Sequence, residues 1–179
     1  MLKEYAIMRL KLNLDRTFVV SDLHFHHHGL FKYDPTACEL FDRTDTNRVK
    51  LVTQWWNEIV SEDDTVLVLG DVCFSATHLS DLIPLNGHKI LVLGNHDNYP
   101  TEYYYANGFE GVYGCVEFNR VLFSHYPTHP CELNTRYKAN IHGHLHNETI
   151  NDPRYLNVSM ERTNYRPMRL MDAFSILGV

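Results

Sequence analysis

Histidine and acidic residues recur in short clusters along this sequence, and each cluster follows an apolar run. The clusters are Asp22-Leu23-His24, Gly70-Asp71, Gly94-Asn95-His96-Asp97, Ser124-His125 and His142-Gly143-His144-Leu145-His146. Side chains two positions apart in an extended segment project to the same face, so Asp-x-His and His-x-His pairs aim both groups at one target. Mixed imidazole and carboxylate donors suit Mn, Fe, Zn, Co or Ni, whereas Mg and Ca prefer oxygen. The sequence therefore predicts a transition-metal site with enough ligands for two ions.

The elements that must position these clusters are mostly strands. Apolar runs predict strands at 17–20, 65–71 and 89–95, a hairpin over 115–125 that turns at Asn119-Arg120, and later strands before His142 and over 155–160. Helical patterns cover 47–60, 77–83 and 100–108. Ligands in open α/β sheets bind outside the carboxyl ends of the strands. We therefore expect a mixed α/β sheet protein that gathers the clusters at one edge.

Composition narrows the class of protein. The chain has 179 residues, 44% of them hydrophobic and 21% charged, which predicts a single globular domain over residues 1–179. No run is long enough for a membrane span, no signal peptide is visible, and none of the four cysteines forms a C-x-x-C pair, so we expect a cytoplasmic protein without membrane contact. A net charge of −6 argues against an extended surface for duplex nucleic acid. It leaves room for a small anionic substrate, because bound metal supplies positive charge locally.

The five clusters, taken in order, resemble the motifs of the calcineurin-like metallophosphoesterases, which run D-x-H, G-D, G-N-H-D, H and G-H-x-H. The match spans residues 22 to 146. More narrowly, S-D-L-H-F-H-H at 21–27 resembles the small single-domain branch common in bacteria and bacteriophages, whose usual D-L-H-F-G-H has glycine where His26 stands. The resemblance implies a four-layer α/β/β/α sandwich of two mixed sheets flanked by helices.

The resemblance also implies roles for individual residues. One divalent ion would be held by Asp22, His24, Asp71 and His146, and a second by Asp71, Asn95, His125 and His144, with Asp71 bridging the two. His96 would lie beside the phosphate and protonate the leaving oxygen or stabilise the transition state, and Asp97 would hydrogen-bond His96. The reaction implied is in-line attack of a metal-bridging hydroxide on phosphorus, with Mn²⁺ the expected activating metal.

Other polar residues are assigned by position alone. His27 and Arg43 are candidates to contact the substrate, although a surface position is the common one for an arginine. His26 and His28 are expected in a solvated loop, and His78 is expected to be an ordinary surface or core histidine. His26 and His28 form a run with Asp22 and His24, which leaves metal binding as the alternative for them, whereas His78 has no partner in the motif pattern.

The expected function is a phosphodiesterase acting on a small nucleotide or cyclic nucleotide. The alternatives are a phosphomonoesterase and, in a different class, a catalytically weak metal-binding scaffold of the same fold that acts through protein contacts. The G-D-x-x-D-R-G motif of protein phosphatases is absent from 70–76, which argues against that branch. Residues 1–14 are expected either to add an edge strand or to mediate a homodimer.

Overall fold

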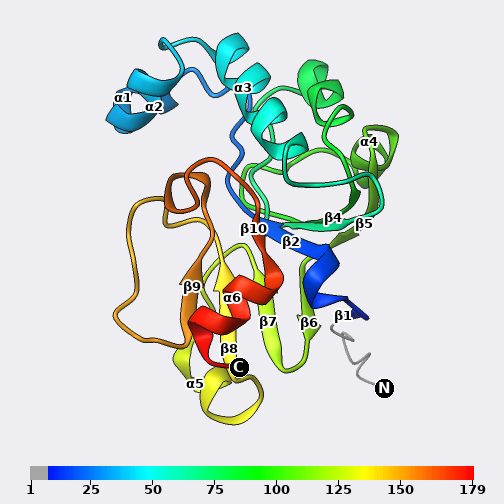
Figure 1. Ribbon diagram of the computed structural model, residues 1–179, viewed down its shortest axis with the longest axis vertical. Coiled ribbons are helices and arrows are strands. Elements are labelled where there is room, and N and C mark those ends of the chain that lie inside the picture. Colours follow the sequence, from blue (N-terminus) through cyan, green and yellow to red (C-terminus); the bar gives the residue numbers. More distant parts are fainter. Residues whose placement is uncertain (1–7) are drawn as a thin grey trace.

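Two five-stranded mixed sheets form the centre of the structure, a computed structural model that describes residues 8–179 (Figure 1). The first, called sheet I, has the order β10-β2-β3-β4-β5, formed by Met168–Arg169, Thr17–Val20, Thr65–Val68, His88–Val92 and Phe109–Tyr113. The second, sheet II, has the order β1-β6-β7-β8-β9, formed by Met8–Arg9, Cys115–Phe118, Val121–Ser124, Ala139–His142 and Tyr155–Asn157.

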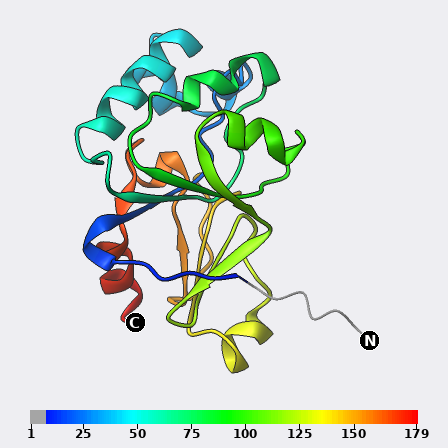
Figure 2. The ribbon, with the colours of Figure 1, turned by 90° about the vertical axis from the view of Figure 1, so that its right-hand side faces the viewer.

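Helices cover the outer face of sheet I, and a short helix lies at the far end of sheet II (Figure 2). Sheet I carries α1 (Leu30–Tyr33), α2 (Pro35–Leu40), α3 (Asp45–Asn57), the 3₁₀ helix η2 (Ala76–Leu82) and α4 (Thr101–Ala106). Sheet II carries the short α5 (Pro130–Thr135), and α6 (Leu170–Leu177) packs beside β2, β9 and β10. Two further 3₁₀ turns are η1 (Leu14–Arg16) and η3 (Met160–Arg162). The predicted α/β/β/α sandwich is confirmed.

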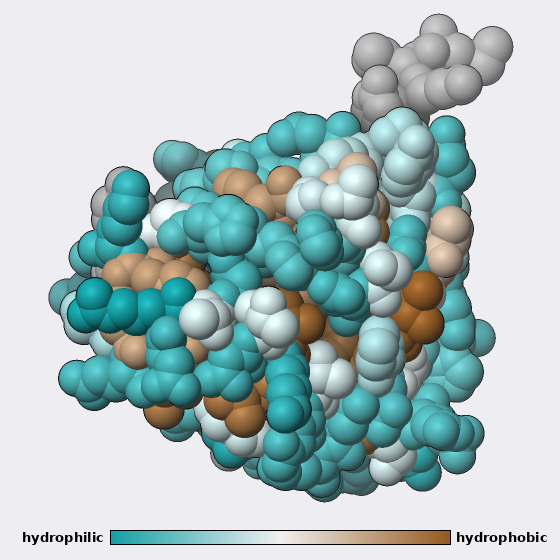
Figure 3. All heavy atoms as spheres, turned by 90° about the horizontal axis from the view of Figure 1, so that it is seen from above, coloured by the Kyte–Doolittle hydropathy of each residue, from teal (hydrophilic) through white to brown (hydrophobic). Residues whose placement is uncertain are grey.

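The strands of sheet I are apolar on both faces because both faces are covered. In β2, Phe18 and Val20 pack among the helices, while Val19 packs in the core between the sheets. Sheet II contributes Phe123 and Ile141 to that inner core. A strand buried on both sides reads as a continuous apolar run, which is why these segments were recognisable in the sequence. The outer face of the helices over sheet I is mostly hydrophilic, with apolar side chains in separate patches (Figure 3).

Strand direction brings the motif clusters to one place. Strands β2, β3, β4 and β5 are mutually parallel, and β7, β8 and β9 are parallel to one another in sheet II. An isolated bridge between Ser21 and Ser159 joins the end of β2 to the segment after β9, with Ser21 N donating to the Val158 carbonyl at 3.0 Å. The carboxyl ends of both sheets therefore meet along one seam.

Several predicted elements are confirmed, with shifted bounds. Helix α3 begins at Asp45 rather than 47 and is capped by Thr44, whose Oγ1 accepts from Asn47 N at 3.4 Å. The predicted hairpin is β6 and β7, and its turn residues Asn119 and Arg120 have φ of 51° and 64°, the left-handed pair that a two-residue hairpin turn uses. The segment 77–83 forms a 3₁₀ rather than an α-helix.

The structure contains several short elements that the sequence patterns did not predict. Helices α1, α2, α5 and α6 and strands β5 and β10 were not expected, because they are short or depend on tertiary packing. Strand β1 pairs in parallel with β6 at the edge of sheet II, so the edge-strand alternative holds for Met8–Arg9. Residues 1–7 of the same expectation lie outside the described residues. No helix within 8–179 is both long and apolar enough to cross a membrane.

Candidate metal centre

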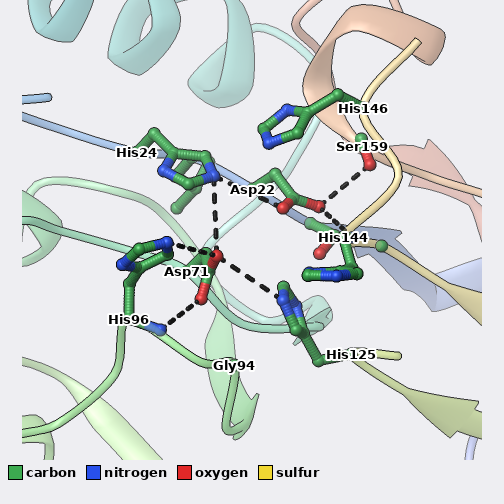
Figure 4. Close-up of polar contacts among 12 residues, drawn as sticks. Asp22, His24, Asp71, Gly94, His96, His125, His144, His146 and Ser159 are labelled. Carbon is green, nitrogen blue, oxygen red and sulfur yellow. Dashed lines mark hydrogen bonds and ion pairs between the residues drawn. The ribbon is translucent and has the colours of Figure 1, made fainter. Parts of the chain in front are cut away.

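Two buried carboxylates lie at the seam between the sheets (Figure 4). Asp22 follows β2, and its Oδ2 accepts from His144 N and Ser159 Oγ, each at 2.9 Å. Asp71 follows β3, and its Oδ1 accepts from His96 N at 2.9 Å. Each carboxylate is thus anchored through one oxygen, while the other oxygen faces imidazole rings. This is the orientation that a carboxylate ligand of a metal requires.

His24 lies between these two carboxylates. Its Nε2 is 3.4 Å from Asp22 Oδ1 and 3.6 Å from Asp71 Oδ2, and its side chain is 3% exposed. Neither ring nitrogen of His24, nor Asp22 Oδ1, has a hydrogen-bond partner among residues 8–179. Burial alone would raise the pKa of Asp22, but its interactions with His24 hold that pKa well below the usual range. Unpartnered buried polar atoms are costly, and a cation among them would remove that cost.

His125 approaches the same carboxylates from sheet II. Its Nε2 is 3.5 Å from Asp71 Oδ2 and 2.9 Å from Asn95 Oδ1, and its Nδ1 is 2.7 Å from the Leu69 carbonyl. A carbonyl can only accept, so a neutral His125 carries its proton on Nδ1, and its Nε2 and Asn95 Oδ1 are then two acceptors that face each other, as two ligands of one cation would. That tautomer is the one required of a metal ligand.

His146 is oriented in the same way by a carboxylate. Its Nδ1 donates to Glu161 Oε1 at 3.0 Å, and this hydrogen bond raises the pKa of His146. The arrangement leaves Nε2 as the free ring atom. His144 lies between Tyr126 and His125, with ring centroids at 4.5 and 5.1 Å, and burial lowers its pKa toward the neutral form that can ligate.

These side chains form two overlapping groups of potential ligands. The ligand atoms of Asp22, His24 and His146 lie within 4.8 Å of one another, and so do those of Asp22, Asp71 and His125. The donor set is mixed oxygen and imidazole nitrogen, which fits divalent transition metals. Both groups share Asp22, whereas the resemblance implies Asp71 as the bridge, so the division of ligands between two ions stays a prediction.

Backbone strain is concentrated at the same place. Left-handed φ values occur at Asp22 (60°), His24 (45°), Asp71 (54°), His144 (68°) and His146 (49°). For a residue with a side chain this conformation costs about 1–2 kcal/mol. Such strain persists only where the surroundings impose it, and it is enriched at functional sites. Five of the seven predicted metal ligands carry it, which points to a site built for a ligand.

Two motif glycines, Gly94 and Gly143, are required because another chain segment lies directly against their Cα atoms, and not because of a positive φ. A Cβ on Gly94 would overlap the Asp71 carboxylate and lie 2.7 Å from Asp71 N. A Cβ on Gly143 would overlap Ser21 Oγ and the Asp22 carboxylate. Each glycine therefore lets a neighbouring chain segment pass directly against one of the two central carboxylates.

His96 lies at the solvent side of the centre. Its ring is 44% exposed and its Nε2 is 4.0 Å from Asp71 Oδ2. The ring rests against Phe74, with centroids 4.5 Å apart, and Phe74 also packs on His24 at 5.1 Å. His96 is thus close to the carboxylates and accessible, as the resemblance implied for a group that acts on substrate.

The predicted contact between Asp97 and His96 is wrong. The Asp97 carboxylate accepts instead from three backbone N–H groups, those of Asp71 at 2.7 Å, Gly94 at 2.8 Å and Val72 at 3.0 Å. The ends of β3 and β4 leave these donors without sheet partners, and a buried carboxylate satisfies them together. Burial raises the pKa of Asp97. Asp97 therefore holds the Asp71 and Gly94 turns together rather than orienting the His96 ring.

The remaining predicted site residues differ in position. His27 stacks on Phe74, with centroids 4.1 Å apart and planes at 5°, and lies at the rim beside His24. Arg43 is exposed in the turn between α2 and α3, and no described contact joins it to the centre. The solvated-loop expectation fails for His26, which is 14% exposed and bonded to Asp81, while His28, at 88% exposed, pairs with Asp45 at 2.6 Å.

Four residues that support the centre were not predicted. Ser159 and Glu161 act on Asp22 and His146 from the segment after β9, and no motif surrounds them. Phe74 packs under the histidine rings. Arg48 is buried in α3 and donates to the carbonyls of Leu23 and His24, the latter at 3.0 Å. A charged residue on the buried face of a predicted helix was the one available signal, for Arg48.

Comparisons with known proteins agree with the fold. No family model matches the chain. The chain is 27% identical over 172 residues to the uncharacterized protein MJ1445 of Methanocaldococcus jannaschii, covering 89% of both proteins. It is 28% identical over 171 residues to the Gene 66 protein of Mycobacterium phage L5, covering 76% of this chain and 80% of the phage protein. The solved structure of AQ665 from Aquifex aeolicus, a protein of unknown function, superposes with a TM-score of 0.69 at 20% identity, covering 89% of this chain and 98% of that one.

Proposed function

We propose that this protein is a dinuclear-metal-dependent hydrolase of phosphate esters, of the calcineurin-like type that its motifs resemble. The observation that carries the proposal is that buried polar atoms of the centre lack hydrogen-bond partners. Asp22 Oδ1 and both ring nitrogens of His24 are buried without hydrogen-bond partners among the described residues, and His24 Nε2 faces Asp22 Oδ1 at 3.4 Å. A divalent cation satisfies carboxylate oxygens and imidazole nitrogens together, and its binding would offset the strain of the ligand backbone.

The protein's own residues would have separate tasks in such a reaction. Two bound divalent ions would supply positive charge for an anionic ester and an acidified water as nucleophile. Asp22 and Asp71 would hold the cations, and the Glu161 carboxylate and Leu69 carbonyl would keep their histidine partners in the ligating tautomer. His96, half exposed beside Asp71, is placed to donate a proton or a hydrogen bond to the leaving oxygen.

The substrate we propose is a small phosphodiester, such as a nucleotide or cyclic nucleotide. A cavity of about 190 Å³ lies beside His27 and His146, on the side of the centre toward α1, and is also lined by Leu30, Asp34, Asn147 and Glu161. Its size suits one sugar or base rather than a polymer segment. The net charge of −6 agrees with a substrate recognised locally by metal rather than by a basic surface.

The test uses synthetic esters. We expect the protein with Mn²⁺ to hydrolyse bis(p-nitrophenyl) phosphate faster than p-nitrophenyl phosphate. His96→Ala should lower kcat at least about 10²-fold, the usual size of general acid catalysis, while binding the same number of Mn²⁺ ions. Asn95→Ala should weaken one ion instead. His88→Ala is the control, because His88 is exposed at the far end of β4 and pairs with Glu110.

Two results would change the proposal. Absence of turnover with Mn²⁺, Fe²⁺, Zn²⁺, Co²⁺ and Ni²⁺, together with retained metal binding, would favour a metal-binding scaffold. Exclusive turnover of the monoester would keep the hydrolase but reject the diester preference. A panel of cyclic nucleotides, 2′,3′-cyclic phosphates, dinucleotides and monophosphates would then identify the substrate class.

A further inference from the structure

A second cluster of metal-ligating side chains lies outside the centre, between the loop after β2 and the 3₁₀ helix η2. It contains His26, His78 and Asp81, whose ligand atoms lie within 4.8 Å of one another. We propose that this peripheral cluster binds one further divalent transition-metal ion, of the Zn²⁺ class, separately from the centre. The proposal goes beyond the hydrolase function and does not depend on it.

The secondary structure places the two residues of η2 side by side. In a 3₁₀ helix residues three apart are stacked one above the other, because there are three residues per turn. His78 and Asp81 have this spacing, and His78 Nδ1 is 3.8 Å from Asp81 Oδ2. In an α-helix residues three apart are also neighbours, but their side chains do not lie directly above one another. The 3₁₀ geometry, which was not predicted for this segment, thus aligns the pair on one side of η2.

His26 completes the cluster from the loop that carries the ligands Asp22 and His24. Its Nε2 is 2.6 Å from Asp81 Oδ2, and its ring stacks on His78 with centroids 3.9 Å apart. The backbone of His26 has a φ of 62°, in the left-handed region that favours glycine. The motif that this loop resembles has glycine there. A histidine therefore occupies this position at a conformational cost, and its imidazole is the group that makes contacts.

The donor set defines the kind of ion. Two imidazoles and one carboxylate, with a fourth position left to water, are a ligand set that Zn²⁺ accepts. The alternative is a simple ion pair between His26 and Asp81, in which the His78 ring would only stack on His26. The His78 ring is 50% exposed and the Asp81 side chain 35% exposed, so both can adjust to a common ion without moving the core.

An ion at the peripheral cluster would connect two segments that flank the centre. One is the loop containing His24 and His27, and the other is the segment from Phe74 into η2. The ring of Phe74 packs against His24, His27 and His96. The peripheral ion would thus hold together both sides of the aromatic support on which His96 rests.

The experiment measures metal binding in a background whose centre is weakened. Asp71→Asn protein is titrated with Zn²⁺ by calorimetry, its bound metal is counted by elemental analysis, and Co²⁺ is used as a probe of coordination through its visible absorption. Adding His78→Ala or Asp81→Asn should remove one equivalent of Zn²⁺ and the associated Co²⁺ bands. Adding His88→Ala should remove none, because His88 is equally exposed, at 53%, and also pairs with a carboxylate.

The outcomes separate this proposal from the hydrolase. A drop of one equivalent that is specific to His78 and Asp81, with unchanged circular dichroism, supports the peripheral site even if no ester is cleaved. An unchanged stoichiometry in both variants overturns it, even if the enzyme is active. Binding so weak that the His88→Ala and His78→Ala proteins behave alike would show an adventitious surface contact and would also overturn it.

Discussion

The two sheets contribute different chemistry to the seam. The carboxyl edge of sheet I supplies both carboxylates, Asp22 and Asp71, together with the amide of Asn95 and the imidazole of His24. Sheet II supplies imidazoles, those of His125, His144 and His146. Sheet I therefore brings the negative charge that attracts cations, and sheet II brings imidazole ligands, of which those of His125 and His146 are oriented by groups behind them. Neither edge holds a complete ligand set, so the centre exists only where the sheets pack together.

The largest expected effect follows from removing charge on the sheet I side. Asp71→Asn keeps the acceptor for His96 N but removes a buried negative charge that faces His24 and His125. We expect the stabilisation by Mn²⁺ in thermal unfolding to be lost and kcat to fall by about 10²–10³-fold or more, as for loss of one electrostatic stabiliser. Without metal, the same variant should be at least as stable as the wild type, because fewer carboxylates are buried together.

The control for this change is Asp63→Asn, which alters an exposed aspartate before β3. It should leave both the metal-free and the metal-bound melting temperatures unchanged. If Asp71→Asn protein were stabilised by Mn²⁺ as strongly as the wild type, the carboxylates of sheet I would not be the principal cation ligands, and the contrast between the two edges would be lost.

A smaller effect is expected on the sheet II side, where the change acts through an imidazole ligand rather than a carboxylate. Glu161→Gln weakens the acceptor of His146 Nδ1, so the ring is held less firmly in its ligating tautomer. Loss of such a supporting contact typically lowers metal affinity 10- to 100-fold. Calorimetric titration with Mn²⁺ should show one weakened ion and one unchanged ion. Glu102→Gln, at an exposed position in α4, is the control, and equal weakening of both ions would contradict the assignment.

The sequence predicted those features of the two sheet edges that depend only on neighbouring residues in the chain. Each ligand cluster directly follows an apolar run, so the strand and its polar end were recognisable together, as in the residues from Ile90 to His96. The supporting contacts join distant segments and were not predictable. Ser159 is 137 positions from Asp22, and Asp97 binds backbone groups at the ends of two different strands. The left-handed backbone conformation of the ligands was also not predictable. Glycine is the usual residue in that conformation, whereas aspartate and histidine occur mostly with negative φ.

The smallest expected effect comes from relieving backbone strain at two positions, one in the metal centre and one in a hairpin turn outside it. Arg120 in the β6–β7 hairpin has a φ of 64°, close to the 68° of His144, but it lies at the turn of the hairpin and not at a strand end that carries ligands. Arg120→Gly creates the Asn-Gly pair preferred in such turns, so urea unfolding should show stability raised by up to about 1 kcal/mol. Metal affinity should not change. His144→Gly relieves the same strain but removes an imidazole of the centre, so it should weaken Mn²⁺ binding whatever it does to stability. If both substitutions left metal binding unchanged, the strain at His144 would be a property of the turn alone.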